Sequence, residues 1–186
     1  MNITELLKAL RVAEKLKNTT RHSYTSGGRH ESVAEHTFRT TLMAYLVKDE
    51  FPDADIEKVI KMCLIHDLGE AFTGDIPSFN KTEADEENEK QQLYNWVKNL
   101  PKPFDSEMLA LYEEMEERKT LESKIYKALD GLEAVISHNE ADLATWSDNE
   151  YELNLVYAED KCTFSSYLTE LRKTLREESE NKIKDN

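Results

Sequence analysis

The chain has 186 residues, of which 39% are hydrophobic, and it carries a formal net charge of −14. This length fits one domain whose core needs no disulfide or metal to hold it together. The acidic balance disfavours a nucleic-acid polymer as partner, because such binding depends on Lys and Arg side chains that neutralise phosphates. A small phosphate ester remains compatible with this charge where local cations receive it.

The composition also indicates the fold class. The chain contains only five glycines and four prolines, whereas Glu, Lys, Leu and Ala are abundant. Such a composition favours helix over strand. We therefore expect an all-α fold, a helical bundle in a single domain that spans residues 1–186.

Cysteine usage and hydropathy bear on the compartment. The two cysteines, Cys63 and Cys162, do not indicate a disulfide framework, so we expect buried thiols and a reducing compartment. Residues 1–10 form an amphipathic pattern rather than a signal peptide, and no apolar run reaches membrane-spanning length. These observations predict a cytoplasmic protein with no membrane partner.

In the first quarter of the chain, apolar residues at helical spacing predict a helix over about residues 3–16. A loop is expected over residues 21–31. Ser32 and Glu35 then form the pattern of a capping box, in which each side chain bonds the backbone N–H near the other. This start of a second helix places His36 in its first turns.

The middle of the chain predicts a third helix that begins near Asp55 and ends close to His66 and Asp67. Residues 69–80 contain two glycines, a proline and several apolar side chains, which is typical of an ordered loop packed onto the body. Two acidic helices are expected next, separated by Pro101 and Pro103, over residues 82–99 and 104–119.

The last third predicts a long helix over about residues 121–146, in which Asp130 stands among apolar neighbours. A buried carboxylate without a partner is costly, so Asp130 requires one. A final helix is expected over residues 164–178, followed by a charged tail. The core of the domain should lie between about residues 6 and 140.

Two histidines and two aspartates on these helices suggest a metal site. His36, His66, Asp67 and Asp130 could converge from three helices in the core of a bundle, and each would be expensive to bury without an ion. The alternative is that the histidines are ordinary core residues and Asp130 is an ion-pair partner. Because all four positions share this character, we favour one divalent metal ion.

Three segments extend this pattern: residues 31–36, residues 66–77 and residues 128–133, which read ESVAEH, HDLGEAFTGDIP and ALDGLE. They resemble the HD superfamily of metal-dependent phosphohydrolases, in the branch of the bacterial 5'-deoxynucleotidases and their eukaryotic relatives. The resemblance covers roughly residues 6–138. It implies an HD-type helical bundle, metal binding by the four residues above, and a homodimer.

The resemblance also implies roles for three further residues. Glu70 matches a residue beside the metal that is implicated in catalysis, Asp75 matches one that handles the attacking water, and Arg21 matches the arginine that receives the phosphate. From the residues alone, Glu70 shares the helical face of His66 only if the helix continues through Gly69. An Asx turn is an equally open interpretation of Asp75.

One position departs from the family. His22 stands directly after Arg21, where the bacterial deoxynucleotidases carry a Trp that packs against the sugar. His22 is therefore a candidate substrate-binding residue whose preference for deoxyribose stays open, and Tyr24 is a second aromatic side chain that could supply this surface. No histidine lies between Asp67 and Asp130, so a single metal ion is the economical expectation.

Together these features predict a metal-dependent phosphohydrolase, and specifically a 5'-nucleotidase that converts a (deoxy)nucleoside 5'-monophosphate to nucleoside and phosphate. Imidazole and carboxylate ligands suit Mn, Co, Fe, Ni, Zn or Mg, so the identity of the ion stays open. The alternatives are hydrolysis of another small phosphate or a nucleoside triphosphate, or a metal-stabilised nucleotide-binding protein with little turnover.

Overall fold

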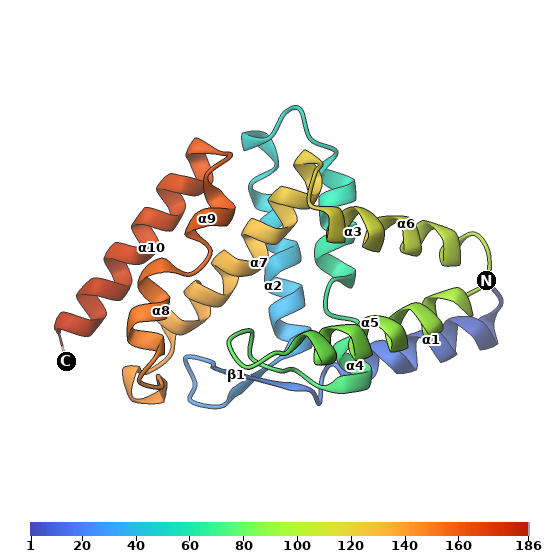
Figure 1. Cartoon of the computed structure of the whole chain (residues 1–186), viewed down its shortest axis with the longest axis horizontal. Helices are drawn as coiled ribbons and strands as arrows, with labels where there is room; N and C mark the ends of the chain where they lie inside the picture. Colours follow the sequence, from blue (N-terminus) through green and yellow to red (C-terminus); the bar gives the residue numbers. More distant parts are fainter. Residues whose placement is uncertain (186) are drawn as a thin grey trace.

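Three helices form the centre of the molecule. The structure, a computed structural model, describes residues 1–185. Helices α2 (Val33–Leu46), α3 (Ile56–Ile65) and α7 (Leu121–Glu140) pack against one another, and the remaining helices surround them (Figure 1). Helix α10 (Ser166–Lys184) covers one end, and α1 (Ile3–Lys15), α5 (Glu83–Lys98) and α6 (Phe104–Glu117) lie toward the other (Figure 1). The predicted all-α helical bundle is confirmed.

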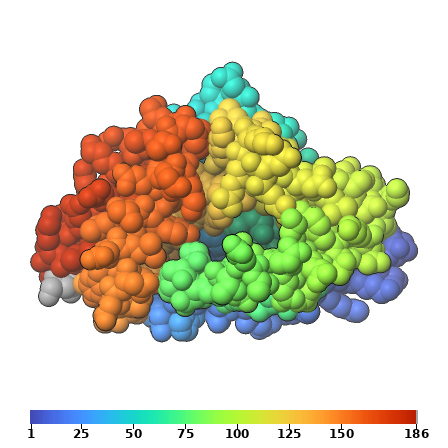
Figure 2. Space-filling view, in the orientation of Figure 1, coloured from blue at the N-terminus to red at the C-terminus, as the bar shows by residue number. Residues whose placement is uncertain are grey.

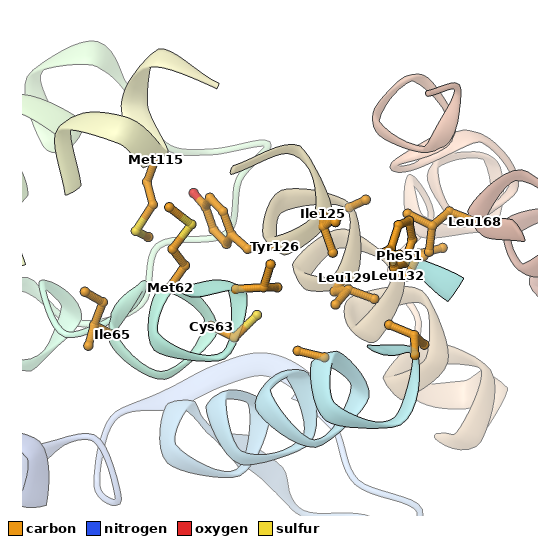
Figure 3. Close-up of a cluster of buried hydrophobic side chains, with 14 of the residues drawn as sticks. Phe51, Met62, Cys63, Ile65, Met115, Ile125, Tyr126, Leu129, Leu132 and Leu168 are labelled. Atoms are coloured by element: carbon orange, nitrogen blue, oxygen red, sulfur yellow. The ribbon is translucent and has the colours of Figure 1, made fainter. Parts of the chain in front are cut away.

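The main hydrophobic core lies between these helices. Figure 3 shows Met62 and Cys63 of α3 close to Ile125 and Leu129 of α7, and all four side chains are fully buried. Both cysteines of the chain are buried and free, as expected. Burial of this apolar surface is the main favourable term in folding, at about 25 cal/mol per Å². The core fixes the relative positions of the helices that carry the polar site described below.

The N-terminal segment contains a small hairpin that the sequence analysis did not anticipate. Helix α1 (Ile3–Lys15) is capped by Asn2, as its polar start suggests. The expected loop over residues 21–31 is wrong in part, because β1 (Thr20–Tyr24) and β2 (His30–Ser32) pair as antiparallel strands with an irregular register. The strands bury polar side chains, Ser23 and Glu31, so they lack the apolar alternation that marks a strand in sequence.

Helices α2 and α3 begin where their capping residues predict. The side chains of Ser32 and Glu35 form the expected capping box, and Asp55 caps α3. Between these helices, η1 (Lys48–Glu50) forms a short 3-10 turn. After α3 the chain makes tight turns into α4 (Glu70–Thr73), so the predicted loop over residues 69–80 starts with one helical turn.

The two acidic helices are present at the predicted positions, as α5 (Glu83–Lys98) and α6 (Phe104–Glu117). Their charged residues lie mostly on the surface. Leu93 and Val97 of α5 and Tyr112 and Met115 of α6 point inward and join the main core. These helices are therefore amphipathic and pack with their apolar sides against the three central helices, which agrees with their charge pattern.

The C-terminal third differs from expectation in two ways. The long helix α7 ends at Glu140 rather than near residue 146, because Ala141 adopts an extended conformation and Asp142 caps the 3-10 turn η2 (Leu143–Thr145). Two short helices not foreseen, α8 (Glu150–Val156) and α9 (Glu159–Cys162), follow. Helix α10 runs on to Lys184, beyond the predicted end at residue 178.

Within residues 1–185, none of the helices combines the length and the apolar character needed to cross a membrane. The cytoplasmic compartment stays a prediction.

A close approach between α7 and α9 depends on Gly131. A Cβ atom at this position would lie 2.6 Å from the Cβ of Ala158, which itself has a positive φ of 63°. We expect Gly131→Ala to lower the free energy of unfolding by about 1–3 kcal/mol, the usual cost of overpacking. Urea denaturation followed by circular dichroism measures this effect.

The paired change Ala158→Gly supplies the control for this prediction. It removes the opposing methyl group and the strain of the left-handed backbone, so the double variant should recover most of the lost stability. Gly27→Ala, at a site where the new Cβ meets nothing closer than 3.7 Å, should change stability little. Unchanged stability of Gly131→Ala would contradict the packing argument.

Candidate metal centre

Four of the predicted site residues meet at one point. His36 comes from α2, His66 and Asp67 from the end of α3, and Asp130 from α7. The Nε2 atom of His36 lies 3.1 Å from Nε2 of His66 and 3.2 Å from Oδ1 of Asp130, and Nε2 of His66 lies 3.0 Å from Oδ2 of Asp67. Donor atoms bound about 2.1 Å from one ion stand roughly 3.0–3.4 Å apart, so this spacing fits a single ion.

Hydrogen bonds fix both imidazole rings in the orientation that metal binding needs. Nδ1 of His66 lies 2.7 Å from the backbone carbonyl of Cys63, which can only accept, so this nitrogen carries the proton. Nδ1 of His36 contacts the carboxylate of Glu133. With both rings neutral and protonated at Nδ1, both Nε2 lone pairs would face the same point as the two carboxylates, an arrangement that suits a cation.

The electrostatics of the four residues lead to the same conclusion. Burial favours a neutral His66, but the carboxylates of Asp67 and Asp130 outweigh burial and raise the pKa of the ring well above its ordinary value. Burial alone would raise the pKa of Asp67, yet His66 and His36 lower it to about 2. Without an ion the centre thus compensates its carboxylates with protons, which a bound metal would displace.

Glu133 is a site residue that the sequence analysis missed. Its side chain is fully buried, and it accepts hydrogen bonds from Nε of Arg39 at 2.6 Å and from Nη1 of Arg21 at 3.4 Å, besides the contact with His36. Although burial opposes ionisation, His36 and the two arginines lower the pKa of Glu133 to about 2. The sequence does contain one sign of this role, because Glu133 follows Asp130 by about one helical turn and so lies on the same face of the helix.

The remaining predicted residues line a cavity next to the four-residue centre. Figure 2 shows the molecule hollowed between the segment leading into α5, the segment of α8, and α7. The cavity has a volume of about 220 Å³. Its walls include His36, Asp67 and Asp130 together with the other predicted site residues, Arg21, His22, Glu70 and Asp75.

Glu70 and Asp75 enter this cavity from α4 and from the segment after it. Glu70 is buried, and its Oε2 has no hydrogen-bond partner within residues 1–185. Burial, together with repulsion by Asp67 and Asp75, raises the pKa of Glu70 well above its ordinary value. Burial is also the main cause of the raised pKa of Asp75. Both carboxyl groups therefore have raised pKa values, which is common for functional groups in clefts.

Arg21 is held in place by carboxylates and keeps donors available. Its Nη1 lies 2.9 Å from Glu31 and 3.4 Å from Glu133, while Nε and Nη2 make no hydrogen bond among the residues described. Arg29, at the other end of the hairpin loop, pairs with Glu35 on the surface instead. Tyr24 stacks on His30 and does not line the cavity, so it does not supply the missing aromatic surface.

Several cavity residues were not predicted as site residues. Nζ of Lys127 lies 2.8 Å from Oδ2 of Asp130, three residues before it on the same face of α7, and Lys127 lines the cavity. On another wall, His138 and Glu150 lie beside His22. Glu150 belongs to the unforeseen helix α8, so only the three-dimensional structure could place it here.

Comparison with known proteins identifies the family. The family model of the HD domain matches residues 13–172. The chain belongs to the HD domain family. An HD-domain relative from Bos taurus, named 5'-deoxynucleotidase, is 30% identical over 139 residues, which cover 73% of this chain and 67% of the relative. The relative of the same name from Dictyostelium discoideum is 28% identical over 144 residues, which cover 72% of this chain and 76% of the relative.

Solved structures agree with the HD-domain assignment. A protein from Magnetospirillum magnetotacticum, described as a predicted metal-dependent phosphohydrolase, matches with a TM-score of 0.81 and 25% identity over 97% of this chain and 93% of that one. A conserved hypothetical protein from Pyrococcus furiosus matches with a TM-score of 0.70 and 28% identity, over 95% of this chain and 99% of its own. The family resemblance found in the sequence is therefore confirmed.

Glu133→Gln tests the arrangement behind the metal centre. The uncharged amide is a weaker acceptor for the Nδ1 proton of His36 than the carboxylate, so the affinity for Mn²⁺ or Co²⁺ should fall about 10–100-fold. Titration of metal-stripped protein by calorimetry measures this, with a thermal melt to check folding. Glu140→Gln changes the exposed partner of Arg39 and should keep the wild-type affinity. Equal affinities in the two variants would contradict the role given to Glu133.

Proposed function

We propose that this HD-domain chain is a metal-dependent phosphohydrolase that converts a nucleoside 5'-monophosphate to nucleoside and phosphate. The observation that carries the proposal is the convergence of two imidazole lone pairs and two carboxylates at a cavity that also contains Arg21. The names of the relatives, 5'-deoxynucleotidase and metal-dependent phosphohydrolase, support the same class of reaction.

The proposed ligands are His36, His66, Asp67 and Asp130. Two nitrogen and two oxygen donors suit a divalent ion such as Mn, Co, Fe, Ni, Zn or Mg, and the affinity order favours the later transition metals. When bound, such an ion lowers the pKa of a coordinated water and polarises a phosphoryl oxygen.

The cavity residues have separate roles in this proposal. Arg21 receives the phosphate, because its Nε and Nη2 donors can bind two phosphoryl oxygens in parallel while Glu31 and Glu133 hold Nη1. Lys127, which also lines the cavity, adds a second positive charge. Both cations offset the negative charge on the phosphoryl oxygens in the transition state.

Glu70 and Asp75 handle water and protons. Asp75 positions the attacking water, and Glu70 takes part in proton transfer, because its Oε2 is buried at the cavity and lacks another partner within residues 1–185. His22 lines the cavity beside Glu150, and in this proposal the nucleoside part of the substrate extends toward these two residues.

The proposal includes a homodimer. Large apolar side chains are exposed along two helices, Ile3, Leu6, Leu7 and Leu10 on α1, and Phe38, Leu42, Tyr45 and Leu46 on α2. Exposed apolar surface of this kind is typical of a protein–protein interface.

Phosphate release tests the proposed reaction. Metal-stripped protein, reconstituted separately with Mn, Co, Mg or Zn, is assayed on ribo- and deoxyribonucleoside 5'-monophosphates. We expect release that requires a divalent ion and is lost in Asp67→Ala, which removes a ligand, but is kept in Asp53→Ala on the exposed turn before α3. The ratio of deoxyribo to ribo rates reports what His22 contributes.

Other outcomes would contradict the monophosphatase assignment. No release with any ion, despite nucleotide binding, would favour the binding-protein alternative. Release of intact triphosphate from a nucleoside triphosphate, without turnover of monophosphates, would favour a triphosphohydrolase.

Glu70→Gln separates catalysis from metal binding. The amide cannot transfer a proton, so kcat should fall by about 10²–10⁴-fold while the metal content stays at the wild-type level. Steady-state kinetics and elemental analysis of the same sample measure both quantities. Glu113→Gln, on the exposed face of α6, serves as the control. Wild-type kcat in Glu70→Gln would remove Glu70 from the mechanism.

A further inference from the structure

A second group of metal-ligating side chains lies on another wall of the cavity. His22 from β1, His138 from α7 and Glu150 from the start of α8 each offer one donor atom, and these atoms lie within 4.8 Å of one another. Oε1 of Glu150 is 3.1 Å from Nε2 of His22 and 3.6 Å from Nε2 of His138. The first distance lies within the donor spacing around a single ion and the second is slightly longer, so small side-chain shifts would bring the three donors to one ion.

The surroundings leave the donor atoms of this cluster available. Oε2 of Glu150 accepts a hydrogen bond from the backbone N–H of Ser147 at 2.6 Å, which leaves Oε1 toward the two rings. The side chains of Glu150 and His138 are buried, and the ring of His138 packs edge-on against Trp146. Nδ1 of His22 has no hydrogen-bond partner among the described residues. Among the described residues, Oε1 of Glu150 is thus the polar group that faces Nε2 of both rings.

We propose that His22, His138 and Glu150 form a second metal site, for a transition-metal ion such as Zn²⁺ or Co²⁺, in the wall of the same cavity. Two imidazoles and one carboxylate favour these ions over Mg²⁺. Three protein ligands leave a coordination position open, as in zinc sites that bind a substrate or water. Because the cluster lines the cavity, that position is accessible to an oxygen atom of a bound ligand.

The ligands of this second site lie outside the part of the sequence on which the expectation of a single ion rests. That expectation counted histidines between Asp67 and Asp130, whereas His22 and His138 lie outside this interval. The third ligand, Glu150, lies in α8, which the sequence analysis did not foresee. The simpler interpretation of the cluster is a direct contact between His22 and Glu150 that binds no metal.

Metal stoichiometry distinguishes the two interpretations without any substrate. Metal-stripped protein is equilibrated with excess Zn²⁺ or Co²⁺, desalted and analysed for protein-bound metal. We expect about two ions per wild-type chain, one in Glu150→Gln and in His138→Gln, and one in Asp67→Ala, which lacks a ligand of the first centre. His30→Ala removes an exposed histidine and should retain two.

The proposal is overturned if the wild type binds one ion, or if Glu150→Gln still binds two. Glu150→Gln preserves the size of the side chain, so it keeps the test valid if His138→Gln fails to fold, and a thermal melt checks each variant. The d–d absorption of Co²⁺ provides a second readout, which should lose one component in Glu150→Gln and the other in Asp67→Ala. Because no step uses a nucleotide, failure of the proposed hydrolysis would leave this result unaffected.

Discussion

The arrangement of the site depends on the interactions of one buried carboxylate, that of Glu133. A charge removed from water is stable only when partners compensate it, and losing one partner of such a group costs about 3–5 kcal/mol. Glu133 finds its partners in His36, Arg21 and Arg39. The same carboxylate therefore orients a proposed metal ligand and the proposed phosphate-binding arginine. Glu133 links α2, the β1–β2 hairpin and α7 in one hydrogen-bonded network. These buried contacts therefore fix the distance between the proposed metal site and the proposed phosphate site.

The rest of the fold serves this arrangement. Helices α2, α3 and α7 bury an apolar core between them (Figure 3). His36 of α2 and Asp130 of α7 line the cavity. The more irregular segments, from Asp67 to Lys81 and around α8, form the remaining walls. Helices thus hold His36 and Asp130, and the turn at the end of α3 holds His66 and Asp67. The shorter elements after them supply Glu70, Asp75 and Glu150. This division is common where a scaffold positions groups for catalysis.

Helical periodicity, capping residues and the HD motifs were sufficient to predict the family, the helical architecture and the groups that meet around His36. Their metal-binding role, and the roles of Arg21, His22, Glu70 and Asp75, stay predictions. The hairpin escaped prediction because its strands are short and bury polar side chains such as Ser23. Glu133 and Glu150 escaped because a carboxylate acquires its importance from partners distant in sequence, which local patterns do not encode. The end of α7 depended on the backbone at Ala141 rather than on hydrophobic pattern.

The central claim is that two imidazoles and two carboxylates hold a catalytic ion. An anomalous difference map from crystals soaked in Mn²⁺ tests it most directly. The account predicts a strong peak about 2.0–2.3 Å from Nε2 of His36 and His66 and from carboxylate oxygens of Asp67 and Asp130. A map without a peak at this point, in which the four side chains still contact one another directly, would contradict the account.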